Sequence, residues 1–386
     1  MASIPRRIAS ELTSRLRSPE TAAVVAGIEN SITKRRREQK MKSGAFRGLH
    51  VDVYRGFVAD GVAKVRVRVV EAPELPGDSR IPYWDVAQAN LRRHAALAIV
   101  GVAVELRIGT HTATEVTDDH GFANFSLPVP KLRVGWHEAH AMTTPIEDGE
   151  VATGTGRVIK PSLQAPFLVI SDIDDTILVT GLTEGVAMVT RTVLREADKR
   201  RAIAGMSSLY RGLARGVPNR TGNRKPEPTF FYVSTGSWSF YPLLQQFMQL
   251  RAFPQGPMFL TDWGPTERYV RRSGAEHKRT AIRRLFEAYP KMPFVLIGDS
   301  GQRDALTYAE MAREFPGRVR LIIIRQVGDD DDDRNIAVRE QAGTLRAEGI
   351  PFHLVLDAAR AAELCQAEGL CDEETLVEVA GESGEV

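Results

Sequence analysis

The sequence predicts an α/β fold with a doubly wound parallel sheet, preceded by an all-β sandwich domain and a helical N-terminal segment. The parallel sheet is predicted from apolar runs that alternate with helical stretches from Pro166 onward. The five runs are Phe167 to Ile170, Phe230 to Val233, Met258 to Leu260, Phe294 to Ile297 and Val319 to Ile324. Continuous apolar runs are typical of strands that are buried on both faces of an open sheet. Ligands of such sheets bind beyond the carboxyl ends of the strands, so the residues after each run are the candidates for a site.

The sandwich is predicted from short alternating segments between His50 and about Lys160, such as Ala63 to Val70 and Val102 to Ile108. Period-two alternation with turn residues between the segments indicates an antiparallel β-sandwich. The stretch from Thr153 to Arg157 contains two glycines and precedes Pro161. We interpret it as a hinge into the second domain.

The N-terminal helix is predicted from an apolar stripe at helical spacing, made of Ile4, Ile8, Leu12 and Leu16. This segment has ten Lys or Arg up to Gly44 but only four Glu, so its stripe suits either a membrane surface or packing against the sandwich. The predicted parts are a basic helical N-terminal segment (1–48), the β-sandwich (49–160), the α/β domain (161–360) with a cap insertion at about 181–228, and an acidic C-terminal tail (361–386).

The composition excludes several classes of protein. With 386 residues, of which 43% are hydrophobic, the chain is neither disordered nor fibrous and is long enough for two or three cores. Two cysteines argue against a disulfide framework or a zinc site and favour a reducing compartment. No apolar stretch approaches the roughly 20 residues that span a bilayer, so we expect a cytoplasmic protein without a transmembrane helix.

A cluster of carboxylates follows the first apolar run directly, in the segment from Asp172 to Thr176. One carboxylate of such a cluster can attack phosphorus and form an aspartyl-phosphate, while a second, two residues on, protonates the departing oxygen and then activates water. The placement of Asp172 and Asp174 therefore predicts phosphoryl transfer. Asp175 is expected to hydrogen-bond locally rather than to take part in the chemistry.

Polar residues also follow the second and fourth runs. Ser234 to Ser237 come after one, Gly298 to Asp304 come after the other, and Lys278 opens an amphipathic helix. Hydroxyl and backbone donors near Ser234, with the cation of Lys278, suit the oxygens of a transferring phosphoryl group. Asp299 and Asp304 supply hard oxygen ligands that, together with Asp172, suit Mg²⁺.

This arrangement resembles the haloacid dehalogenase-like superfamily, whose four motifs are matched in order by Asp172/Asp174/Thr176, Ser234, Lys278 and Asp299/Asp304. The resemblance implies that Asp172 is the nucleophile and Asp174 the general acid and base. It also implies that the Asp174 backbone carbonyl is an additional metal ligand and that Thr176 has a positioning role. Superfamily members with Thr in place of Asp174 tend to preserve the aspartyl-phosphate, so an Asp implies a phosphatase.

A closer resemblance is carried by Ser171 to Ile177, by Trp238 and Tyr241-Pro242 after Val233-Ser234, by His277-Lys278, and by Gly298 to Asp304. These segments resemble the catalytic domain of the actin-patch-associated phosphatidate phosphatase family. That family is Mg²⁺-dependent and converts phosphatidate to diacylglycerol. The sequence departs from it at Thr235-Gly236-Ser237, where a Pro-containing turn is expected, and at Ala305, where Pro is usual.

The expected site therefore has three sets of residues. The catalytic set is Asp172, Asp174, Ser234 and Lys278; the substrate-binding set is Thr176, Thr235, Gly236 and Trp238; and the metal set is Asp172, Asp174, Asp299 and Asp304. The aromatic residues from Trp238 to Tyr241 suit either a lipid-facing mouth or packing. The cap insertion carries ten Lys or Arg between Arg191 and Lys225, which suit either an anionic head group or a solvated basic face.

We therefore expect an Mg²⁺-dependent phosphatase that hydrolyses phosphatidate, a phospholipid substrate at a membrane surface. Peripheral contact with the inner face of the membrane through basic residues belongs to this expectation, and no specific protein partner is inferred. Two alternatives remain open. The same chemistry would serve a soluble or nucleic-acid phosphomonoester, and the chain could instead be a non-catalytic membrane- or protein-binding adaptor.

Overall fold

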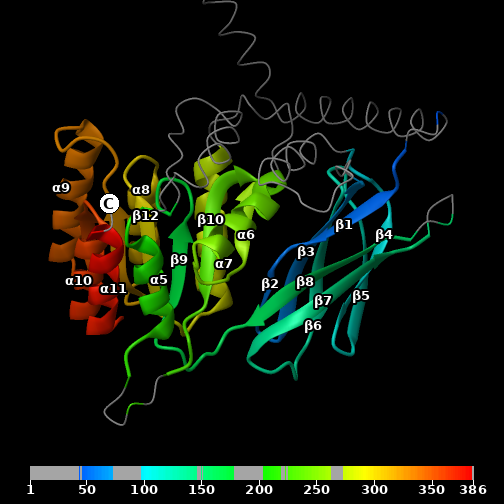
Figure 1. Cartoon of the computed structure of the whole chain (residues 1–386), viewed down its shortest axis with the longest axis horizontal. Coiled ribbons are helices and arrows are strands. Elements are labelled where there is room, and N and C mark those ends of the chain that lie inside the picture. Colours follow the sequence, from blue (N-terminus) through cyan, green and yellow to red (C-terminus); the bar gives the residue numbers. More distant parts are fainter. Residues whose placement is uncertain are drawn as a thin grey trace, which may run out of the picture.

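The computed structural model describes residues 43, 46–72, 97–145, 149, 151–177, 203–218, 222, 225–261 and 273–384. These residues form a mixed eight-stranded sheet and a parallel six-stranded sheet, which lie side by side (Figure 1). Nearly all of the predicted N-terminal helical segment lies outside the described residues. Within the described ranges, no helix is both long enough and apolar enough to cross a membrane.

The first domain consists of eight strands. They are β1 (Leu49–Val53), β2 (Gly56–Ala59), β3 (Val62–Glu71), β4 (Ala103–Ile108), β5 (His111–Val116), β6 (Phe122–Pro128), β7 (Gly135–Thr143) and β8 (Thr153–Lys160). Alternation builds these strands: in β3, Val65, Val67 and Val69 are buried in the core of this domain, and charged residues stand between them. The strand order is β1-β3-β2-β8-β7-β4-β5, and β6 pairs with β3.

The structure contradicts the fold class predicted from the sequence. An antiparallel β-sandwich of separate sheets was expected, but all eight strands belong to one hydrogen-bonded sheet, in which β2 and β8 pair in parallel. Of the predicted N-terminal segment, only residues 43 and 46–48 are described, and they form no helix. Period-two alternation reports which face of a strand is buried, but it does not report which strands pair or in which direction.

The predicted hinge from Thr153 to Arg157 was also wrong. These residues belong to β8, which pairs antiparallel with β7. Gly154 and Gly156 lie against β1, where an added Cβ would come 2.4 Å from the Val51 carbonyl oxygen and 2.5 Å from that of Val53. The two glycines therefore allow two backbones to approach closely, which is a role of glycine within strands.

The second domain contains the parallel sheet. Its strands are β9 (Leu168–Asp172), β10 (Phe230–Ser237), β11 (Met258–Thr261), β12 (Phe294–Asp299), β13 (Val319–Arg325) and β14 (Phe352–Val355). Its helices are α5 (Met206–Arg215), α6 (Tyr241–Leu250), α7 (Ser273–Ala288), α8 (Asp304–Glu314), α9 (Asp333–Ala347), α10 (Ala358–Ala367) and α11 (Glu373–Gly384), with the 3₁₀ turn η2 (Trp238–Phe240). The strand order is β11-β10-β9-β12-β13-β14.

Helices cover both faces of this sheet (Figure 1). Successive residues of β9 enter opposite cores: Val169 packs with α5, α6, α10 and α11, whereas Leu168 and Ile170 pack with α7, α8 and α9. Burial on both faces explains why the strands read as continuous apolar runs. The strand order reverses at β9, which places β10 on one side of it and β12 on the other.

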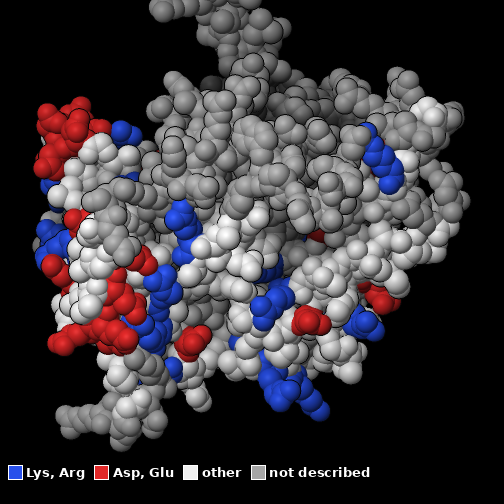
Figure 2. Space-filling view, viewed as in Figure 1, with Lys and Arg blue, Asp and Glu red and all other residues white. Residues whose placement is uncertain are grey.

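The predicted cap and the predicted C-terminal tail meet where α5 packs against α11. Of the predicted cap, the structure describes residues 203–218, 222 and 225–228, and α5 packs into the same core as the sheet. Residues 361–384, predicted as a tail, complete α10 and form α11, which packs on α5. Figure 2 shows acidic side chains gathered over this side of the molecule.

Two cations of the predicted cap have partners there. The Arg211 guanidinium lies 2.7 Å from the Glu382 carboxylate, and that of Arg215 lies 2.7 Å from the Glu378 carboxylate. These two cations therefore join α5 to α11. Other cations of the predicted cap fall outside the described residues. They are the Lys and Arg from Arg191 to Arg201, together with Arg220 and Arg224.

The two domains share buried surface. The rings of Tyr54 and Trp238 lie 4.5 Å apart between their centroids, and the Arg55 backbone N–H donates to the Tyr241 hydroxyl at 3.0 Å. On the other face of the parallel sheet, the Tyr289 hydroxyl donates to the Val58 carbonyl at 3.0 Å. Residues of the first domain thus reach into both cores of the second.

Candidate active site

The candidate site lies at the carboxyl ends of the central parallel strands. Asp172 is the last residue of β9 and Asp299 the last residue of β12, and these strands are neighbours in the sheet. Because the strand order reverses here, the crevice beyond their carboxyl ends is where ligands of such sheets bind.

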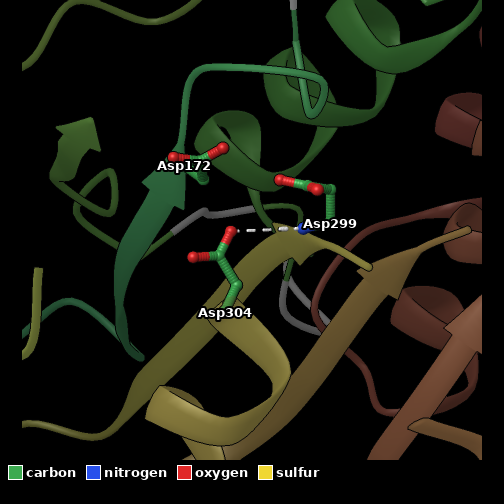
Figure 3. Close-up of side chains that lie close together, drawn as sticks. All are labelled: Asp172, Asp299 and Asp304. Atoms are coloured by element: carbon green, nitrogen blue, oxygen red, sulfur yellow. Dashed lines mark hydrogen bonds between the residues drawn. The ribbon is translucent and has the colours of Figure 1, made fainter. Parts of the chain in front are cut away.

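Three carboxylates meet at this point. Asp172, Asp299 and Asp304 each offer an oxygen, and these oxygens all lie within 4.8 Å of one another (Figure 3). All three side chains are fully buried. Asp304 opens α8 and accepts a hydrogen bond from the Asp299 backbone N–H at 3.3 Å. Gly298 makes room for it, since a Cβ there would lie 2.8 Å from the Asp304 side chain.

Lys278 joins two members of this cluster. Its Nζ lies 2.6 Å from Asp172 Oδ1 and 2.7 Å from Asp304 Oδ1, and it donates to Gln302 Oε1 at 3.0 Å. Burial alone would lower the pKa of Lys278, but the two carboxylates outweigh burial and raise it. The side chain is therefore a fixed cation within the site.

One lysine does not balance this set of carboxylates. Burial raises the pKa of Asp172 well above its ordinary value; Lys278 opposes that shift, while Asp304 and Asp299 add to it. Burial, followed by the charge of Asp304, raises the pKa of Asp299 to about 7. The cluster is thus short of positive charge.

The donor set fits a small divalent cation. Carboxylate oxygens are the ligands that Mg²⁺ prefers. Asp299 Oδ2 is buried and accepts no hydrogen bond from any residue that the structure describes. A buried oxygen without a donor is costly unless something else satisfies it. Asp172, Asp299 and Asp304 are the residues that would hold the ion.

Asp174 stands beside this cluster and is paired with Ser234. Ser234 Oγ donates to Asp174 Oδ2 at 2.6 Å and accepts from the Gly236 backbone N–H at 2.9 Å. Burial raises the pKa of Asp174, and the hydrogen bond from Ser234 followed by the charge of Lys278 partly offsets the rise. A raised pKa suits a group that delivers a proton.

Thr176 and Asp175, the other two polar residues of the segment from Asp172 to Thr176, make fewer contacts with the cluster. Thr176 Oγ1 donates to Asp172 Oδ2 at 3.4 Å, which is long for a hydrogen bond. Asp175 has a φ of 52°, a left-handed conformation that Asp tolerates better than most residues. Its backbone carbonyl accepts from Arg325 Nε at 2.8 Å. The hydrogen bond ties the turn after β9 to the end of β13.

Three of the predicted substrate-binding residues follow Ser234. The carbonyls of Thr235 and Gly236 accept from Thr261 Oγ1 at 2.9 and 3.0 Å, which ties the end of β10 to β11. Trp238 is 7% exposed, and its ring packs on Tyr54 of the first domain. It therefore faces the junction between the domains.

Several residues that support the site were given no role of their own from the sequence. Gln302, within the predicted segment from Gly298 to Asp304, accepts from Lys278. Arg325 fixes the turn after β9, and Thr261 fixes the end of β10. Arg325 and Thr261 directly follow predicted apolar runs, so inspecting every strand end would have found them. Tyr210 is different: its hydroxyl lies 2.7 Å from Ser171 Oγ, a contact between α5 and β9 that no local pattern reveals.

The site lies in a region that is similar to a known family. Residues 167–326 match the family model described as the catalytic domain of phosphatidate phosphatase APP1. A phosphatidate phosphatase APP1 of Saccharomyces cerevisiae is 33% identical over 157 residues, which cover 40% of this chain and 25% of that protein. An uncharacterized protein of Schizosaccharomyces pombe is 29% identical over 187 residues, which cover 46% of this chain and 29% of that protein. The match thus spans between a quarter and a third of the length of these relatives.

Among solved structures, a carbohydrate acetylesterase from Xanthomonas citri aligns with 10% identity and a TM-score of 0.22. The alignment covers 76% of this chain and 72% of the esterase. A TM-score of this size supports no conclusion about either domain.

Proposed function

We propose that the chain is an Mg²⁺-dependent phosphatidate phosphatase, because residues 167–326 are similar to the catalytic-domain family of phosphatidate phosphatase APP1. The observation that carries the proposal is the buried group of Asp172, Asp299 and Asp304 around Lys278, at the carboxyl ends of the central strands. A fully buried cluster with excess negative charge is unfavourable for stability, and such clusters are typical of functional sites.

In the first step, a carboxylate oxygen of Asp172 attacks phosphorus, and the bond from phosphorus to the alcohol oxygen breaks. Asp174 gives its proton to that oxygen, so that the alcohol leaves neutral and an aspartyl-phosphate remains. The raised pKa of Asp174 supports its being protonated at this stage. Lys278 places a fixed positive charge against Asp172, where charge accumulates on the transferring oxygens.

In the second step, Asp174, now a carboxylate, takes a proton from water, and the water oxygen attacks phosphorus. The bond from phosphorus to Asp172 breaks, which releases inorganic phosphate and restores both carboxyl groups. Ser234 holds Asp174 through its 2.6 Å hydrogen bond and thereby fixes the direction of proton transfer. Mg²⁺, when bound by Asp172, Asp299 and Asp304, supplies charge neutralisation between the nucleophile and the phosphate dianion.

The proposal predicts that Asp172→Asn lowers phosphate release from phosphatidate by at least about a thousandfold, because the substituted amide cannot form the aspartyl-phosphate. Asp175→Asn is the matched control, since it changes the same functional group three residues away at a position that favours Asn. Phosphate release is measured from mixed micelles with Mg²⁺ and then with a chelator. The control should keep most of its activity, and the chelator should abolish that of the wild type.

The possible outcomes test the catalytic mechanism and the identity of the substrate separately. Equal turnover by the wild type and Asp172→Asn would remove Asp172 from the mechanism. Release from soluble phosphomonoesters, but not from phosphatidate micelles, would keep the mechanism and contradict the lipid substrate. Activity that survives the chelator unchanged would contradict the role given to Mg²⁺.

A further inference from the structure

A cavity of about 660 Å³ is lined by residues of both domains. One wall is a single face of α7, from which His277, Thr280, Ala281, Arg284 and Ala288 line the cavity. The spacing of these residues follows the helical repeat, so the cavity runs along three turns of α7, about 17 Å at 1.5 Å per residue. We call this cavity the interdomain groove.

The opposite wall of the interdomain groove comes from the first domain. Phe57 and Ala59 of β2, Val65 of β3 and Phe125 of β6 line it, and the edge strand β11 closes the floor with Phe259. The size of the groove lies within the range of about 300–1,000 Å³ that is typical of sites for small organic molecules. Its lining is largely apolar.

Two residues that line the groove are neighbours in the sequence of the elements that carry the catalytic residues. His277 lines it and directly precedes Lys278, whose Nζ lies 2.6 Å from Asp172. Trp238 also lines it and directly follows β10, the strand that carries Ser234 and Gly236. Ala288 lies ten residues further along α7 than Lys278, or about 15 Å away.

The charged residues of the groove favour an anion. Four cations line it, Arg55, Lys64, Arg66 and Arg284, against the single carboxylate of Glu287. Lys64 and Arg284 are exposed, and Lys64 donates to the Ser126 hydroxyl at 2.9 Å. The apolar walls suit an aliphatic chain, and the net positive lining attracts the anionic amphiphile to which that chain belongs.

We propose that the interdomain groove binds an acyl chain of the lipid phosphomonoester whose phosphate is hydrolysed beside Asp172. The inference rests on the proposed function and adds to it a place for the aliphatic part of the substrate. The first domain is then part of the substrate site, because β2, β3 and β6 form one wall of the groove. Each methylene that leaves water for an apolar wall strengthens binding by up to about fourfold, so longer chains bind more tightly until the groove is full.

The test narrows the end of the groove far from the catalytic residues. Ala288→Phe adds a ring at the last residue of α7, and Ala347→Phe, at the exposed last residue of α9, is the matched control. Phosphate release is compared between dioleoyl and dihexanoyl phosphatidate in the same micelles. Ala288→Phe should lower the ratio of kcat/KM for the long chain over the short chain by about tenfold, whereas Ala347→Phe should leave that ratio unchanged.

A binding measurement separates this inference from the proposed function. A pyrene-labelled long-chain phosphatidate is titrated into Asp172→Asn protein with and without Ala288→Phe, and a roughly tenfold weaker affinity is expected for the double variant. Ala59→Phe narrows the opposite wall and replaces Ala288→Phe if far-UV circular dichroism shows that the latter is unfolded.

The outcomes are distinct. Release of phosphate with an unchanged chain-length ratio and unchanged probe affinity would overturn the groove and leave the phosphatase standing. Failure of the wild type to hydrolyse any phosphomonoester, with probe affinity still lowered by Ala288→Phe, would overturn the phosphatase and leave the groove as a lipid site.

Discussion

Lys278 is the residue on which the charge balance of the site depends. It lies within 2.7 Å of both Asp172 and Asp304, and Asp299 completes a buried group in which carboxylates outnumber the cation. Buried charges that lack a partner cost several kcal/mol, so this arrangement lowers the stability of the metal-free protein. The site therefore gives up stability for function, a common feature of active sites.

This imbalance predicts the behaviour of Asp299→Asn. In chelator, we expect the melting temperature to rise by about 2–8 °C over the wild type, because one uncompensated buried charge is removed at a gain of about 1–2 kcal/mol. Mg²⁺ should raise the melting temperature of the wild type, since it binds only the folded state, and should raise that of Asp299→Asn much less. Differential scanning fluorimetry with and without Mg²⁺ measures both effects.

Asp331→Asn, in the exposed acidic loop before α9, is the control for the loss of one negative charge. The melting temperature of Asp331→Asn should equal that of the wild type both with Mg²⁺ and in chelator. A metal response of Asp299→Asn as large as that of the wild type would exclude Asp299 as a ligand.

The positions of the site residues follow from the sequence to a considerable extent. Asp172 and Asp299 were expected together because parallel strands place their carboxyl ends at one edge, and the structure has them there. The orientation of Trp238 could not be predicted from the sequence, because its ring packs on Tyr54, almost two hundred residues earlier in the chain. Contacts between domains leave no periodic signal in a single sequence.

At the scale of elements, the first domain was less predictable than the second. The apolar runs mark strands β9 to β13 because burial on both faces leaves no polar positions. β14 was overlooked, since four residues with a half-buried His353 give a weak pattern. In the first domain, alternation located β3 and β4, but the pairing of β2 with β8 depends on contacts far apart in sequence.

The crossing of β1 over β8 gives a prediction at this scale. Gly156→Ala should lower the free energy of unfolding by about 1–3 kcal/mol, because the new methyl group would lie 2.5 Å from the Val53 carbonyl oxygen and must displace a backbone. Thr155→Ala is the control, since neighbouring residues of a strand point to opposite faces and Thr155 is exposed. Urea unfolding measures both variants.

The control should change the free energy of unfolding by no more than about 0.5 kcal/mol. Equal stability of Gly156→Ala and the wild type would mean that the segment has the freedom of a hinge, as the sequence alone suggested.

At the scale of the whole molecule, the two domains are joined by buried contacts on both faces of the parallel sheet. Tyr54 and Phe122 belong to the same core as Trp238, while Phe57 packs edge-on against Phe231 on the opposite face at 5.7 Å. Aromatic pairs of this kind contribute about 0.5–1.5 kcal/mol each beyond their buried area. The first domain therefore supports the end of β10, which carries Ser234, as well as its own core.

Such contacts predict that the domains unfold as one cooperative unit. Leu106 lies in β4, fully buried within the core of the first domain, and Leu106→Ala should cost about 2–5 kcal/mol. In urea, the midpoint for loss of phosphatase activity should fall together with the midpoint for loss of β-structure by circular dichroism, because coincident transitions mark two-state unfolding. Independent domains would give a different result: activity would persist at the wild-type midpoint while the β-structure signal alone shifted. The free energy of unfolding that Leu106→Ala removes in β4, remote from Asp172, should therefore also lower the urea midpoint at which phosphatase activity is lost.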